Sequence, residues 1–357
     1  MLPHEAAGED EKRSVQRPAG KINLVAVQAS PELADYASAH AFHTKMAALA
    51  QRAVAAVDRR HPTLVAFPEA IGLFLTFVPF HYDDIKHCRT FRQALPKVLS
   101  RRLPSFLGTM WRHKLPSLRR AVFLNAALAA EKIYADTFAS LAREHGVYLL
   151  AGSLYTPPIE EEAVKGRYIL STSVYNTSYL FSPQGVILRR IPKVNLVEPM
   201  ETVAGFGRGL KSELCPVETA LGRIGVLICY DAFHHTLVEH YDALGADILV
   251  QPSYNNDPWD GPWSAGRGLT EGQAWLRFGL PSMIQGRENI RYGVNPMMVG
   301  QIFDMVGQGR SSISINTGRP GASLEDALLA IAATPDGEEI VAATVDAPDG
   351  IRPTAVV

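Results

Sequence analysis

Cysteine is scarce in this sequence. The 357 residues include only Cys88, Cys215 and Cys229, and these three fit neither a disulfide framework nor a CxxC zinc pattern. A chain of this length can bury a large core without covalent cross-links. We therefore expect a reducing, cytoplasmic setting in which a thiol stays free to react.

The sequence also lacks long apolar runs and an excess of charge of one sign. The longest apolar stretch, residues 71–80, is too short to cross a bilayer. The formal net charge of −1 gives no reason to expect nucleic acid as a partner. Residues 1–20 contain no apolar signal region, so we expect a disordered or surface-laid arm instead of a secretion signal. No linker-like tract follows, which favours one domain over residues 21–345 and a tail over 346–357.

Strand-like and helix-like segments alternate along the chain. Apolar runs rich in branched residues predict buried strands, which include residues 22–28, 63–67, 147–153, 222–229, 294–300, 311–315 and 338–345. Helical patterns and stop signals predict helices at residues 42–60, 135–146, 234–244 and 268–278. A hairpin is expected around residues 183–185. This order is typical of an α/β fold with mixed sheets.

Three polar residues of different chemical types follow strongly apolar segments. Glu69 ends TLVAFPE, Lys193 follows GVILRRIP, and Cys229 ends RIGVLIC. Taken singly, they are interpreted as a helix-capping glutamate, a solvated lysine and a core cysteine. Taken together, they supply a base, a cation for an oxyanion and a nucleophile. We therefore predict that they form one catalytic site.

The order of these motifs is similar to that of the nitrilase or carbon–nitrogen hydrolase superfamily. FPE is followed by RIPKVNLVEPME and then by GVLICYD, while GRENIRYGVNPMMVG and DMVGQGRSSI resemble C-terminal strand regions of that family. The resemblance covers residues 21–345. It implies a four-layer α–β–β–α sandwich, pairing of sandwiches in homo-oligomers, and catalysis without a metal or an organic cofactor.

The resemblance also implies roles for individual residues. Glu69, Lys193 and Cys229 match the family's Glu-Lys-Cys triad, and Glu201 matches a second glutamate found in many members. Glu69 would take the thiol proton and pass it to the leaving nitrogen. Lys193 and the backbone N–H of Tyr230 would stabilise the oxyanion. The product would be a thioester on Cys229 that water releases as an acid.

The residues after the cysteine bear on the substrate. This chain reads Cys-Tyr-Asp, as many amidases do, whereas nitrilases proper usually carry Trp-Glu there. The expected reaction is hydrolysis of a non-peptide amide of a small molecule to a carboxylic acid and ammonia or an amine. Three alternatives stay open: transfer of the acyl group to an amine, hydrolysis of a nitrile, and a catalytically silent scaffold on the same fold.

A basic amphipathic insertion is expected at about residues 71–134. Between residues 86 and 132 the sequence contains eleven lysines and arginines but only one acid, Glu131. This segment is interpreted as a solvated helix pair over the core, as a lid that selects a lipophilic or acidic acyl group, or as a peripheral membrane contact.

Three further segments bear on binding. Residues 81–88 (HYDDIKHC) match no known spacing of metal ligands, so no metal is expected there. Residues 205–209 (GFGRG) lack the GKS/T of a phosphate-binding loop. Tyr254 and Asn255, in a loop after a predicted strand, are expected to line the substrate pocket.

Overall fold

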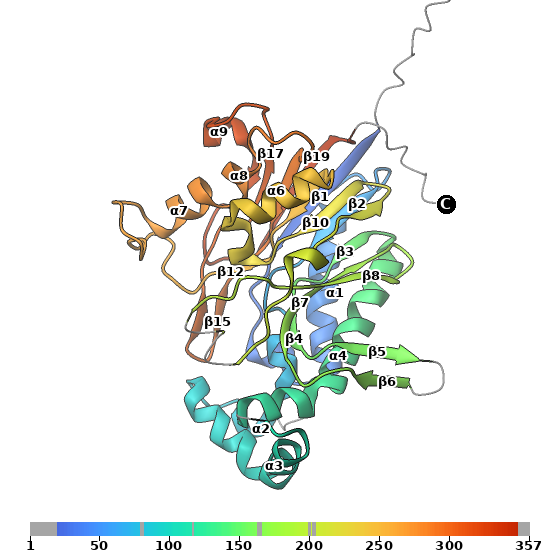
Figure 1. The fold of residues 1–357 in the computed structure, drawn as a ribbon, viewed down its shortest axis with the longest axis vertical. Coiled ribbons are helices and arrows are strands. Elements are labelled where there is room, and N and C mark those ends of the chain that lie inside the picture. The colour runs from blue at the N-terminus through green and yellow to red at the C-terminus, as the bar shows by residue number, and fades with distance from the viewer. Residues whose placement is uncertain are drawn as a thin grey trace, which may run out of the picture.

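The computed structural model describes residues 20–78, 82–115, 118–162, 166–198, 201 and 205–348. Most of the expected N-terminal arm and C-terminal tail, together with His81, lie outside these ranges. Two large sheets stack on one another, and helices cover their outer faces (Figure 1). Among the described residues, no helix is both long enough and apolar enough to cross a membrane.

The first sheet has seven strands in the order β19-β1-β2-β3-β7-β4, with β8 paired to β7. β1, β2 and β3 are parallel neighbours, while the other pairings are antiparallel. The strands are β1 (Lys21–Gln28), β2 (Thr63–Ala66), β3 (Tyr148–Leu150), β4 (Leu154–Thr156), β7 (Tyr175–Phe181), β8 (Ile187–Pro192) and β19 (Glu339–Asp346).

The second sheet has six strands in the order β18-β17-β13-β11-β10-β9. Its central strands β10, β11 and β13 are parallel, and its edges are antiparallel. The strands are β9 (Val217–Thr219), β10 (Gly222–Val226), β11 (Ile248–Val250), β13 (Tyr292–Asn295), β17 (Ser312–Ile315) and β18 (Leu328–Ile331).

Side-chain alternation along β1 shows how the layers are built. Val25 and Val27 pack into the hydrophobic cluster that contains the first helices, whereas Ile22, Leu24 and Ala26 pack into the cluster shared with the second sheet. Successive strand residues point to opposite faces. A strand that is apolar throughout therefore lies between a helical layer and another sheet.

Helices form the two outer layers. On the first sheet these are α1 (Ala39–Ala55) and α4 (Leu118–His145), and on the second they are α6 (His235–Ala243), α7 (Glu271–Phe278), α8 (Leu280–Met283) and α9 (Leu324–Ala327). Three two-stranded pairs complete the structure: β5 (Ile159–Glu162) with β6 (Gly166–Ile169), β12 (Ser253–Tyr254) with β14 (Met297–Met298), and β15 (Gly300–Ile302) with β16 (Met305–Gly307).

The boundaries of several elements differ from the prediction. α1 begins at residue 39 because the Ser38 side chain accepts a hydrogen bond from the N–H of Ala41 and so caps the helix. The predicted strand at 294–300 is divided among β13, β14 and β15, with Pro296 between the first two. Proline has no N–H for a sheet ladder, so it ends β13.

The basic segment folds into helices at one end of the molecule (Figure 1). α2 (Tyr82–Ile85) and α3 (Phe91–His113) precede α4, which continues through the helix predicted at 135–146. α3 contains Pro96 and Pro104 and is kinked at Arg102, whose φ of −128° is not helical. Pro104 lies two residues beyond Arg102, and a proline at that position is sufficient to cause the kink. Beyond the kink, Trp111 is 86% exposed.

Candidate active site

Glu69 follows β2 on a tightly constrained turn. Ala70 has a left-handed φ of 61°, and its N–H donates to the Ser153 hydroxyl at 2.9 Å. The neighbouring backbone at Gly152 also has a positive φ, and a Cβ there would lie 1.9 Å from the carbonyl oxygen of Pro68. Only glycine permits this approach. The turn therefore holds the Glu69 carboxyl in the interior between the two sheets.

Cys229 lies beyond β10, at the start of the 3₁₀ turn Cys229–Phe233. Its φ is 51°, a left-handed conformation that is strained for a residue with a side chain and that clusters at functional sites. Its N–H donates to Pro252 O at 2.9 Å, and Gln251 Nε2 donates to its carbonyl at 3.0 Å. The thiol is directed to Tyr254 O at 3.7 Å. Hydrogen bonds to the segment that directly follows β11 thus hold the strained backbone in place.

Lys193 follows β8 and is buried against two carboxylates. Its Nζ lies 2.9 Å from Glu69 Oε1 and 2.9 Å from Glu201 Oε2. Burial alone would lower the pKa of this ammonium, but the charges of Glu69, Cys229 and Glu201 outweigh burial and raise it. Lys193 is therefore a fixed cation at any physiological pH.

The acid and the thiol of the site both hold their protons more firmly than usual. Burial raises the pKa of Glu69, against the opposing effect of Lys193. Burial, followed by the Glu69 charge, raises the pKa of Cys229 well above its ordinary value, although Lys193 lowers it. One backbone donor and one side-chain donor also fix the Glu69 carboxylate: Tyr254 N–H at 3.0 Å and Asn176 Nδ2 at 2.8 Å. The resting cysteine is a neutral thiol beside a base.

Asn176 joins the two carboxylates and was not predicted from the sequence. Its Nδ2 lies 2.8 Å from Glu69 Oε1 and 3.1 Å from Glu201 Oε1, and Tyr155 OH donates to the same Glu201 oxygen at 3.3 Å. Asn176 is fully buried in β7, where it is the one amide side chain among the strand's buried residues. A lone amide within such a strand was the signal available, because buried polar groups require partners.

Asp231 holds the chain segment that carries Lys193, and sequence reasoning did not place it in the site. Its carboxylate accepts the N–H groups of Val194 at 3.0 Å and Asn195 at 2.6 Å. Burial raises its pKa to about 6, against the lowering effect of these hydrogen bonds. In the sequence, the Asp of Cys-Tyr-Asp only favoured amides over nitriles, yet in the structure it connects the cysteine turn to the lysine segment.

The remaining predicted residues occupy different places. The N–H of Tyr230 belongs to the first turn of the 3₁₀ helix beside Cys229, where such groups lack intrahelical partners. Tyr254 donates its backbone N–H to Glu69 and, as expected, also lines the cavity beside the site. The Asn255 side chain donates to the carbonyls of Asp257 at 2.9 Å and Gln308 at 3.1 Å. It therefore braces the loop, and Asn256 lines the cavity instead.

A cavity of about 520 Å³ adjoins this site. Its wall contains polar groups of the site, apolar side chains from the basic segment and residues of the β15–β16 turn. The lining residues are Leu73, Thr76, Phe77, Phe91, Leu95, Val122, Phe123, Tyr155, Glu201, Phe206, Tyr254, Asn256, Asp304, Met305 and Val306. Within the described ranges, no group of three or more His, Cys, Asp or Glu residues is arranged to hold a metal ion.

Comparison with known proteins identifies similar sequences. A sequence model of the carbon-nitrogen hydrolase family matches residues 24–277. An apolipoprotein N-acyltransferase of Geobacter metallireducens is 28% identical over 210 residues, which are 51% of this chain and 38% of that protein. An omega-amidase NIT2 of Xenopus tropicalis is 33% identical over 137 residues, 36% of this chain and 45% of that protein. The match spans less than half the length of either relative.

Solved structures share the fold. An amidase from Nesterenkonia sp. in complex with acrylamide is 17% identical, with a TM-score of 0.57 over 94% of this chain and 92% of that chain. A carbon-nitrogen hydrolase from Helicobacter pylori is 18% identical, with a TM-score of 0.58 over 92% and 90%. These likenesses confirm the predicted α–β–β–α sandwich with mixed sheets.

Proposed function

Because the chain belongs to the carbon–nitrogen hydrolase family, we propose that it hydrolyses a non-peptide amide through a thioester on Cys229. One observation carries the proposal. Glu69, Lys193 and Cys229 come from three separate strand ends, and their buried functional groups interact with one another. A base, a cation and a nucleophile in such contact are what acyl transfer requires.

The first half of the reaction forms the thioester. Glu69 takes the proton of the Cys229 thiol as sulfur attacks the amide carbon. The carbonyl oxygen becomes an oxyanion, which the Lys193 ammonium and the Tyr230 N–H stabilise. When the tetrahedral intermediate collapses, the C–N bond breaks and Glu69 gives its proton to the departing nitrogen. Ammonia or an amine leaves.

The second half releases the acid. Glu69, again ionised, takes a proton from water as the water oxygen attacks the thioester carbon. The C–S bond then breaks, and the proton on Glu69 returns to the Cys229 sulfur. The carboxylic acid leaves and the site is restored.

The electrostatics of the site favour a general base over a preformed thiolate. A cysteine whose pKa is raised by burial is neutral at physiological pH, so its proton must be removed during attack. Glu69 is placed for that task. Glu201 and Asn176 position Lys193 and Glu69 without acting on the thiol themselves.

A second candidate reaction is acyl transfer to an amine. The similarity to an apolipoprotein N-acyltransferase over 210 residues supports it. The same thioester would form, and an amine would replace water in the second half. We rank hydrolysis first because the Tyr-Asp pair after the cysteine matches the amidase branch.

The test is acid release from a panel of amides by wild type and by Cys229→Ala. We expect wild type to turn over some member of the panel and Cys229→Ala to turn over none. Circular dichroism should show that both proteins are folded. If no amide yields acid but an added amine is acylated as the substrate's own nitrogen is released, acyl transfer replaces hydrolysis. If the variant is as active as wild type, the proposed mechanism is wrong.

A further inference from the structure

The cavity beside the catalytic site is polar only in part. Tyr155, Glu201 and Tyr254 contribute polar groups where it meets the catalytic residues. Most of the remaining wall is aromatic or aliphatic, with Phe77 and Phe123 among the larger side chains. Its volume of about 520 Å³ lies within the range of roughly 300–1,000 Å³ that holds drug-sized ligands. A small primary amide would leave much of it empty.

A groove along α3 continues this cavity. It has a volume of about 690 Å³ and shares Phe91, Leu95 and Asp304 with the cavity. Its other lining residues are Arg92, Pro96, Leu99, Ser100 and Leu103. The two spaces therefore meet at the beginning of α3, where Phe91 N–H donates to Asp304 Oδ1 at 2.7 Å.

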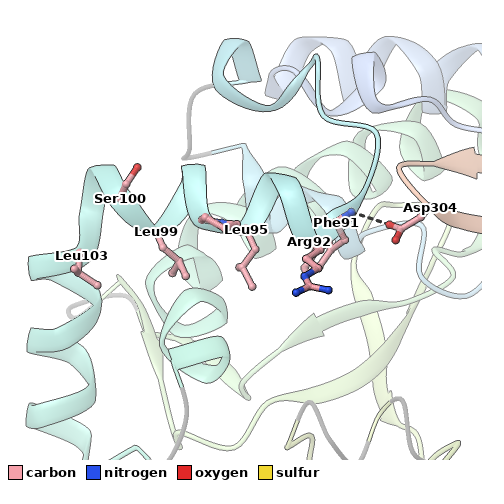
Figure 2. A pocket seen from close by; sticks show the side chains of 8 residues that line it. Phe91, Arg92, Leu95, Leu99, Ser100, Leu103 and Asp304 are labelled. Atoms are coloured by element: carbon pink, nitrogen blue, oxygen red, sulfur yellow. Dashed lines mark hydrogen bonds between the residues drawn. The ribbon is translucent and has the colours of Figure 1, made fainter.

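The groove is an apolar track on one face of the helix. Leu95 and Leu99 are four residues apart in the part of α3 before the kink, which places them on one side of the helix. Leu103 follows the kink, and Figure 2 shows it with the other two along the groove that all three line. Leu103 is 41% exposed. An exposed apolar strip that leads into an active-site cavity is typical of a binding groove.

We propose that the substrate amide carries a long unbranched apolar chain, which fills the cavity and lies along the groove on α3. This inference rests on the proposed hydrolysis and names its substrate class. Burial of each methylene in such a lining is favourable by about 0.8 kcal/mol. Continuity of cavity and groove selects a chain over a compact apolar group, because a compact group would reach only the cavity.

The primary test measures kcat/KM against chain length in two series. One series holds linear primary amides from acetamide to dodecanamide, and the other holds N-alkyl acetamides of matched length. We expect kcat/KM to rise by up to about fourfold per methylene in one series, the factor that corresponds to about 0.8 kcal/mol. The series that responds shows whether the chain belongs to the acyl or the amine side. Equal kcat/KM at all lengths in both series overturns the proposal.

A pair of matched variants locates the chain. Leu103→Glu places a charge in the groove, and Leu128→Glu places one on α4, outside the cavity and groove; both leucines are 41% exposed. We expect Leu103→Glu to reduce kcat/KM for the longest substrate at least tenfold and to leave the shortest unchanged. Leu128→Glu should alter neither. Equal effects of the two variants on the long substrate contradict the groove.

Binding separates failure of this inference from failure of the proposed function. Calorimetry with Cys229→Ala compares decanamide with propanamide and needs no turnover. One outcome is that wild type hydrolyses no amide while decanamide binds far more tightly than propanamide and Leu103→Glu weakens the binding of decanamide. That result supports the chain-binding site and rejects the proposed hydrolysis. If short amides are hydrolysed through Cys229 but chain length affects neither rate nor binding, hydrolysis stands and the chain site is rejected.

Discussion

Lys193 is the charge on which the buried site depends. Its ammonium contacts the carboxylates of Glu69 and Glu201, and all three side chains are almost completely buried. Removing one partner of a buried ion pair leaves an uncompensated charge, which costs about 3–5 kcal/mol. In the proposed mechanism the same ammonium stabilises the oxyanion, and loss of one oxyanion donor typically lowers kcat by about 10²–10³.

We therefore predict that Lys193→Met loses both activity and stability. The free energy of unfolding in urea should fall by about 3–5 kcal/mol, and kcat should fall at least a hundredfold. Lys86→Met is the control, because Lys86 pairs with Asp83 at the surface and such pairs contribute at most about 1 kcal/mol. A Lys193→Met protein with wild-type kcat would remove Lys193 from the mechanism.

The pKa of Glu69 sets the acid side of the pH profile. Glu69 acts as a base only when ionised, and burial raises its pKa from the usual 4.5. Because its pKa is raised, Glu69 becomes protonated, and so inactive as a base, at a higher pH than an ordinary glutamate. We predict that kcat/KM declines on the acid side with an apparent pKa above 4.5, measured from pH 4 to 9.

Ionisation of the Cys229 thiol determines how kcat/KM should change at alkaline pH. In the proposed mechanism Glu69 removes the Cys229 proton during attack, so kcat/KM should show no rise between pH 7 and 9. An enzyme that relied on a preformed thiolate would become faster as the thiol ionised. Such a rise would show that Glu69 is not the base of the first step.

At the scale of the element, the junction of β2 and β3 fixes the position of the base. Gly152, just after β3, meets the Pro68 carbonyl so closely that a Cβ would lie 1.9 Å away. Gly166 has a similar φ, 68° against 74°, but a Cβ added there would meet nothing within 4 Å. Replacing either glycine by alanine therefore carries the same cost for a left-handed backbone. Only the alanine at position 152 would also clash with the Pro68 carbonyl.

We predict that Gly152→Ala displaces the Glu69 turn and that Gly166→Ala does not. Both should lose about 1–2 kcal/mol from the left-handed conformation. Gly152→Ala should lose more stability in urea unfolding and at least tenfold in kcat, because Glu69 shifts relative to Cys229. Equal losses of stability and activity in the two variants would mean that the close approach is unimportant.

Elements were predicted well where apolar periodicity was strong and less well where proline or packing intervened. The strands that became β1, β2 and β19 were placed within a residue or two. The kink of α3 at Arg102 was not foreseen, although Pro104, two residues beyond it, was the available signal. The continuity of α4 was not foreseen because it depends on how α4 packs against α3 and η2 (Leu73–Phe77). Local sequence does not contain that information.

At the scale of the molecule, the first and last strands of the described chain, β1 and β19, are neighbours at one edge of the first sheet. β1 pairs with β19 from Lys21–Asp346 to Gln28–Glu339. Val341 and Val345 are buried on this last strand. The family match ends at residue 277, so the strand that completes the sheet lies beyond the matched region although every triad residue lies within it.

We predict that a chain truncated after residue 337 does not fold, although it retains Glu69, Lys193 and Cys229. Loss of β19 exposes a full edge of β1 and the apolar cluster behind it. Thermal unfolding followed by circular dichroism should show no cooperative transition. A transition within a few degrees of the full chain would show that the sheet is stable without β19.

That Glu69, Lys193 and Cys229 come together could be predicted from sequence, because each directly follows a strand-like segment and the order of the three motifs resembles that of one family. Asn176 and Asp231 could not be placed, since their roles depend on contacts with Glu201 and with the Lys193 segment that only the folded chain creates. From the sequence, a lid was one of three interpretations of the basic segment at about residues 71–134, and a pocket lined by Tyr254 and Asn255 was expected separately. The continuity of the cavity and the groove depends on the β15–β16 turn, which contributes Asp304 from more than 200 residues away.

The exposed Trp111 gives this chain a fluorescent reporter of its own. Trp259 and Trp275 are 6% and 7% exposed, whereas Trp111 is 86% exposed. Iodide in solution therefore reaches the indole of Trp111 far more readily than those two. Any lipid surface or second protein that covers this end of α3 would shift the emission to shorter wavelength and shield it from quenching, and a Trp111→Phe variant would identify that signal without an added dye.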